Sequence, residues 1–153
     1  MLKKLLEKQI VFEWTLRFLA PFSRRTFFDS WTRSLTGLLA RLNVLLNRPK
    51  KFQELANLGQ AWLEMMPPDG QKFFKVYPPK GETVEAEIHL HCPLRGTGDA
   101  HACYKLMNYD RQLMDAVGGQ LVVLESQSNS GNPYCKLAIR RKGESIEDLQ
   151  PAH

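Results

Sequence analysis

The chain has 153 residues, of which 43% are apolar and 24% charged. These values are typical of one globular domain and exclude a chain that is disordered throughout. The net charge of +5 is uneven, because residues 1–51 carry 11 basic and 3 acidic side chains and the remainder carries 10 and 13. A basic first third could bind an anionic membrane or an acidic partner, or it could be a helix face that is exposed to solvent. The basic residues are spread singly, so we expect no nucleic-acid binding.

The first residues do not resemble a targeting segment. Their apolar stretch is broken by Glu7, Lys8, Glu13 and Arg17, which predicts neither a secretion signal nor a membrane span. Three cysteines cannot all pair with one another, and free thiols fit a reducing compartment. We therefore expect a cytoplasmic protein, with membrane association as the alternative.

Helical spacing of apolar residues covers the first 66 residues. A helix is predicted from Leu2 to Leu19, followed by Pro21, and Ser23 is the expected cap of a second helix. The apolar stripe of that second helix consists of Phe27, Trp31, Leu35, Leu38, Leu42 and Leu45. A third helix follows over residues 52–65 and ends at a Pro-Pro-Asp-Gly sequence.

After that break, the apolar pattern changes to alternation. It predicts strands at 72–77 and 84–91, a helix over 99–117, and strands at 120–126 and 134–141. Strands joined by short turns favour antiparallel pairing. We therefore predict an α+β fold: a helical N-terminal half followed by a four-stranded antiparallel sheet, with a helix between the two strand pairs. The predicted single domain, 1–153, consists of helical residues 1–66, a β-β-α-β-β segment 72–141 and a flexible tail 142–153.

The predicted helix over 99–117 carries an unusual face. Asp110 shares this face with Cys103, Met107 and other apolar residues at three- and four-residue spacings. A carboxylate on a buried face must be paired, hydrogen-bonded or neutralised. Cys92 and Cys135 fall in the inward phase of two predicted strands. We therefore predict that the three thiols and Asp110 converge on one pocket.

Thiolate, imidazole and carboxylate groups are the usual ligands of zinc and iron. A site could combine Cys92, Cys103 and Cys135 with one further ligand. The candidates for that ligand are His89, His91, His101 and Asp110. His91 is preferred because it adjoins Cys92, and the same pair could form a Cys–His nucleophile. The alternative is that the three cysteines only pack in the core.

Part of the chain resembles a known family. Cys92-Pro93, Tyr109-Asp110 within a helix, and Gly131 with Cys135 at the last strand resemble the L-2-amino-thiazoline-4-carboxylic acid hydrolase-like proteins. The resemblance covers about residues 85–140. It implies a bacterial hydrolase-like protein that cleaves an amidine- or thiazoline-type C–N or C–S bond, with Asp110 and Cys92 as the catalytic residues. The family has a cysteine shortly before the aspartate, where this chain has Met107 or Asn108.

A second resemblance covers the C-terminal strands. The segment from Gly119 through Glu125 to Cys135 resembles 4-vinyl-reductase-type small-ligand-binding domains, although Gln127 and Ser128 replace an expected cysteine. The two resemblances imply that Tyr109, Met107 and Glu125 contact a ligand. The alternative function is a non-catalytic sensor or carrier that binds a metal, haem or small ligand.

The first predicted helix has more apolar surface than one buried stripe needs. Leu2, Leu5, Ile10, Val11, Trp14 and Phe18 cover much of its circumference. We therefore expect a homo-oligomer, or contact of the basic N-terminal helices with a membrane or a protein partner.

Overall fold

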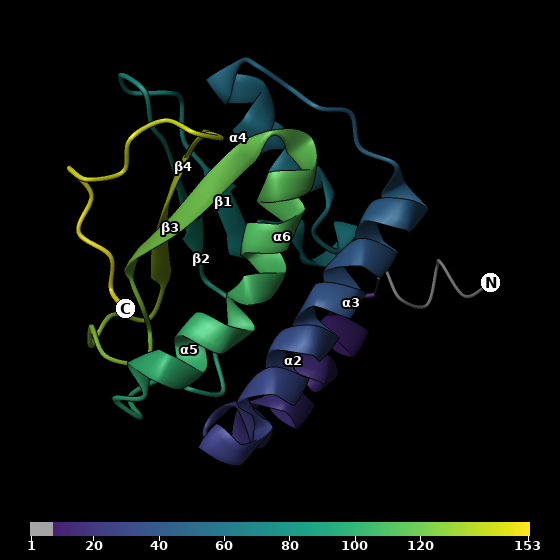
Figure 1. Ribbon diagram of the computed structural model, residues 1–153, viewed down its shortest axis with the longest axis vertical. Coiled ribbons are helices and arrows are strands. Elements are labelled where there is room, and N and C mark those ends of the chain that lie inside the picture. Colours follow the sequence, from purple (N-terminus) through teal and green to yellow (C-terminus); the bar gives the residue numbers. More distant parts are fainter. Residues whose placement is uncertain (1–7) are drawn as a thin grey trace.

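The computed structural model describes residues 8–153, so the predictions for Leu2 and Leu5 lie outside the described residues. Five α-helices and four strands are present in this part of the chain (Figure 1). The helices are α2 (Gln9–Ser23), α3 (Asp29–Asn47), α4 (Leu55–Glu64), α5 (Ala100–Leu106) and α6 (Asn108–Val117). Two 3₁₀ helices, η1 (Thr26–Phe28) and η2 (Pro68–Phe73), join them to their neighbours.

The strands form one antiparallel sheet in the order β1-β2-β4-β3. Their bounds are β1 (Phe74–Val76), β2 (Val84–Ile88), β3 (Gly119–Glu125) and β4 (Cys135–Arg141). The register places Val84 opposite Ile139, and Leu121 opposite the same Ile139. These alternating apolar residues therefore share one face of the sheet, as their spacing predicts. The predicted α+β class and the antiparallel sheet are confirmed.

Two helices cover the apolar face of the sheet. Helix α4 contacts β1, β2 and β4, and α6 contacts β3. Helices α2 and α3 form a further layer, in which α3 packs on α6 and α2 packs on α5 (Figure 1). The core fills the space between these layers, and Trp62, Leu113 and Leu137 are fully buried in it.

Three predicted boundaries in the N-terminal half are wrong. Helix α2 continues through Pro21 to Ser23, because the Arg24 amide donates past the proline to Ala20 O at 3.3 Å. Ser23 ends this helix and does not cap the next, since its hydroxyl donates to Ala20 O at 2.7 Å. The predicted 72–77 strand is shorter because η2 occupies residues 68–73.

The predicted 99–117 helix is divided in two. Asp99 caps α5, its carboxylate accepting from the Ala102 amide at 2.9 Å. The helix then breaks at Met107, and α6 begins at Asn108. Helix α6 ends at Val117, and Gly118 follows it in the left-handed conformation with φ of 91°.

Part of the second sheet face is covered by the C-terminal segment, for which the sequence predicts a flexible tail. Arg140 is buried on this face and forms a bidentate ion pair with Asp148, with both N–O distances 2.6 Å. Ala152 N donates to Val123 O at 2.8 Å, at the edge of the sheet. Residues 142–153 therefore lie against β3 and β4 in the structure. No helix among residues 8–153 has the length and apolar content needed to cross a membrane.

We predict opposite effects for two Gly→Ala substitutions within helices. A Cβ at Gly59 on α4 would lie 2.7 Å from Val76 Cγ1 and 2.8 Å from Val84 Cγ1, so helix and sheet would have to separate. A Cβ at Gly37 on α3 would meet only Asn108 Nδ2, at 3.9 Å. Gly59→Ala should lower the free energy of unfolding by about 1–3 kcal/mol. Gly37→Ala should raise it by about 0.4–1 kcal/mol.

Urea denaturation of both variants checks this pair. Equal effects of the two substitutions would contradict the close approach of α4 to the sheet.

Candidate functional site

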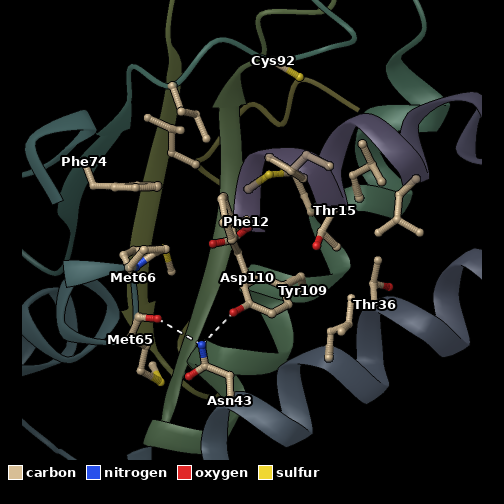
Figure 2. A pocket seen from close by; sticks show the side chains of 18 of the residues that line it. Phe12, Thr15, Thr36, Asn43, Met65, Met66, Phe74, Cys92, Tyr109 and Asp110 are labelled. Carbon is tan, nitrogen blue, oxygen red and sulfur yellow. Dashed lines mark hydrogen bonds between the residues drawn. The ribbon is translucent and has the colours of Figure 1, made fainter. Parts of the chain in front are cut away.

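A cavity of about 220 Å³ lies between the helical layer and one end of the sheet. Its walls come from α2, α3, the 64–68 segment, the α5–α6 junction and the ends of β2 and β4, and most of the lining side chains are apolar. Engineered apolar cavities of roughly 150 Å³ bind benzene, so this volume admits a small organic molecule. Figure 2 shows Cys92 and Asn43 at opposite ends, with Asp110 and Tyr109 between them.

Asp110 is the buried one of two carboxylates that line the cavity: only 6% of this residue is exposed, whereas Glu64 is exposed. Its Oδ1 accepts a hydrogen bond from Trp62 Nε1 at 3.0 Å, whereas Oδ2 accepts no side-chain hydrogen bond from residues 8–153. Burial raises the pKa of Asp110 to about 6, although the Trp62 bond and the charge of Arg111 act in the opposite direction. The carboxyl therefore changes its charge close to neutral pH and has an oxygen available to a ligand.

Tyr109 lies beside Asp110 and is fixed by its neighbours. Its hydroxyl oxygen accepts from Asn43 Nδ2 at 2.7 Å, and the same amide donates to Met65 O at 3.0 Å (Figure 2). The Phe12 ring lies 6.0 Å from the Tyr109 ring. Since the hydroxyl oxygen serves as an acceptor, its own proton can be donated to a group in the cavity. Burial also raises the pKa of Tyr109, so the proton stays in place at neutral pH.

The three thiols line the sheet end of the cavity. Burial raises the pKa of the Cys103 thiol to about 11 and that of Cys135 to about 12, and it also raises the pKa of Cys92. Each sulfur accepts one hydrogen bond. Ser126 Oγ donates to Cys103, the backbone amide of Gln127 donates to Cys135, and the backbone amide of Leu94 donates to Cys92. The thiols are therefore protonated at neutral pH, which makes them poor nucleophiles in this state.

Gln127 holds this end of the cavity together. Its side chain is fully buried; Oε1 accepts from Arg95 Nε at 2.7 Å and from the Cys92 amide at 3.2 Å. Its Nε2 donates to Leu90 O at 2.8 Å. One amide side chain thus ties the 90–95 loop to the end of β3, and this fixes Cys92 at the cavity wall.

The structure brings together most of the residues that the sequence singled out. Those that line the cavity are Cys92, Cys103, Cys135, Asp110, Tyr109, Met107 and His91. Glu125 does not line it; its carboxylate accepts from Asn132 Nδ2 at 2.5 Å. His89 and His101, two of the alternative ligand candidates, do not line it either: His89 is paired with Glu87, and His101 lies near Asp29.

The thiols are not arranged as a metal centre in the described part of the chain. Within residues 8–153, no three His, Cys, Asp or Glu side chains are grouped so that they could hold a metal ion. A zinc or iron ion stays a prediction, which elemental analysis of protein purified without chelators tests.

Comparison of the chain with protein-family models, with curated proteins and with solved structures found no match.

Several residues of the site could not be found from sequence. Asn43 and Trp62 hold Tyr109 and Asp110 from helices distant in the chain. Gln127 follows a strand in a stretch that is typical of an exposed polar loop, yet it is fully buried. Apolar spacing gives no signal for polar residues that are buried through long-range hydrogen bonds.

We predict that Asp110→Asn stabilises the protein at neutral pH. The pKa of Asp110 is about 6 when folded and 3.8 ordinarily, so the folded state binds the proton more tightly. The stability from this proton is complete below about pH 4 and is lost as the pH rises through about 6. The variant should therefore exceed the wild type by up to roughly 3 kcal/mol above about pH 7 and match it near pH 4.

Denaturation at several pH values measures this difference. Asp115→Asn is the matched control on α6, because Asp115 is exposed and its ion pair with Lys142 contributes little. An Asp110→Asn effect that does not change with pH would contradict the raised pKa.

Proposed function

We propose that the protein binds a small organic molecule that has an apolar body and a positively charged or hydrogen-bond-donating group. The observation that carries the proposal is Asp110: a carboxylate that lines an apolar cavity and has no cationic side chain hydrogen-bonded to it among residues 8–153. Burying a carboxylate in this way costs stability unless a partner compensates it. A ligand cation would supply the missing partner.

The neighbouring groups are consistent with such a ligand. Tyr109 has a proton to donate to a hydrogen-bond acceptor elsewhere on the ligand, whereas an ammonium group, which has no acceptor, would bond to Asp110. The remaining walls are largely apolar, as in most small-molecule sites, where a few polar groups set the orientation. The volume of about 220 Å³ favours a compact ligand.

We predict that short-chain amines bind more tightly than alcohols or carboxylates of the same length. Titration calorimetry with such a matched series measures this preference. Asp110→Asn should weaken amine binding by on the order of tenfold and change alcohol binding little, because only the amine uses the charge. Asp115→Asn should leave both affinities unchanged. Equal affinity for amines and carboxylates in the wild type would contradict the proposal.

A second candidate is hydrolysis, as the resemblance to the thiazoline-carboxylate hydrolase-like proteins implies. The observation that favours it is the pKa of Asp110, which at about 6 suits a general base at neutral pH. An amidine-type group carries N–H donors and takes up a proton, so it belongs to the ligand class proposed above. In this scheme Asp110 accepts a proton from the water that attacks the amidine carbon, a C–N or C–S bond of that carbon breaks, and the proton passes to the leaving nitrogen or sulfur. Cys92 contacts the substrate as a neutral thiol.

Incubation with 2-aminothiazoline-4-carboxylate separates the two candidates. If the protein is a hydrolase, we expect turnover that Asp110→Asn lowers by 10²-fold or more and that Asp115→Asn leaves unchanged. Cys92→Ser should have a smaller effect than Asp110→Asn, because the thiol is protonated. Binding without turnover would support a carrier or sensor instead.

A further inference from the structure

Most of the exposed large apolar side chains lie on the helical hairpin formed by α2, η1 and α3. Seven of the ten in the described part of the chain belong to it. Ile10, Trp14 and Phe18 follow one another at four-residue spacing on α2 and are 62%, 63% and 58% exposed. On α3, Leu38 and Leu45 are 61% and 70% exposed, and the buried residues of this helix are small ones such as Thr36 and Ala40. Both helices therefore present an uncovered apolar face.

An aromatic cluster joins the two faces at the tip of the hairpin. The Phe22 ring lies 5.2 Å from Phe18 on α2 and 5.0 Å from Trp31 on α3. Phe27, which connects the helices, is 89% exposed. In Figure 1 this hairpin forms the side of the molecule away from the C-terminal segment. The apolar residues thus form one surface over two helices and their connection.

The charges around this surface indicate which kind of partner it binds. Residues 8–51 carry nine Lys and Arg against two Asp and Glu, a net charge of +7. Arg25 and Arg41 are exposed on the hairpin, whereas Asp29 is engaged by Lys105 at 2.5 Å. A second copy of the chain would oppose like charges across the contact. An anionic lipid surface complements them, and exposed Trp and Phe beside Arg are typical of helices that lie in a membrane interface.

We propose that the α2–α3 hairpin docks on an anionic lipid bilayer, with the apolar side chains entering the interface and the arginines contacting lipid headgroups. The docked surface adjoins the cavity, because Val11 and Thr15 line both the cavity and a shallow groove beside Trp14 on the outside of α2. Docking needs no ligand at Asp110, so its success or failure is independent of the function proposed above.

Vesicle co-sedimentation of the full chain tests the proposal. We expect binding to phosphatidylcholine vesicles that contain phosphatidylglycerol and much weaker binding to phosphatidylcholine alone or at high salt. Trp14→Ser combined with Phe18→Ser should lower the partition coefficient by on the order of tenfold or more. Arg25→Gln and Arg41→Gln should each lower it by on the order of fivefold. These side chains are exposed, so circular dichroism should show unchanged folding.

Two matched controls lie away from the hairpin. Ile146→Ser removes an exposed apolar side chain from the C-terminal segment, and Lys80→Gln removes a charge from the β1–β2 turn; neither should change vesicle binding. No binding to anionic vesicles, or equal binding to neutral ones, would overturn the proposal. So would a dimer in light scattering that Trp14→Ser with Phe18→Ser dissociates, because a second copy would then cover the face.

Discussion

The hydrogen bond between Trp62 and Asp110 is the constraint around which the interior is arranged. It joins α4 to α6, the two helices that cover the sheet, and it lies where one wall of the cavity meets the core. A buried carboxylate with one indole donor is only partly compensated. The fold tolerates it because Trp62 itself is fully buried and contributes a large apolar area in the same place.

A side-chain amide lies at each end of the cavity. At one end Asn43 orients Tyr109, and at the other Gln127 fixes the loop that carries Cys92. Both amides have their hydrogen bonds directed into the protein, so they set the positions of their neighbours and leave the ligand contacts to Tyr109 and Asp110. A rigid wall of this kind favours recognition of one ligand shape, because few side chains have to be ordered on binding.

The sheet and the position of the pocket could be predicted from sequence because both depend on local periodicity. The alternation around Val84 places its inward set correctly, and the helical spacing of Cys103 and Asp110 places both at the cavity. The break at Met107 could not be predicted, since the apolar spacing is continuous through it.

The outer helices show the limit of the same reasoning. An apolar stripe was expected along α3, but its most buried residues are Thr32, Thr36 and Ala40. Small side chains allow α3 and α6 to approach closely, while Leu38 and Leu45 on the adjoining face of α3 are exposed. Hydropathy alone does not distinguish a stripe that faces the core from one that faces a surface such as a membrane.

The C-terminal segment also has a consequence for how the chain avoids self-association. Strand β3 is an edge strand of seven residues, and a strand of this length with free amides and carbonyls is a template for pairing with another chain. The backbone amide of Ala152 donates to the carbonyl of Val123 on this edge. The Arg140–Asp148 ion pair holds the C-terminal segment against the sheet. Asn129 Nδ2 also donates to Ala152 O, so the protection of this edge depends on several contacts of the C-terminal segment, none of whose residues lines the cavity.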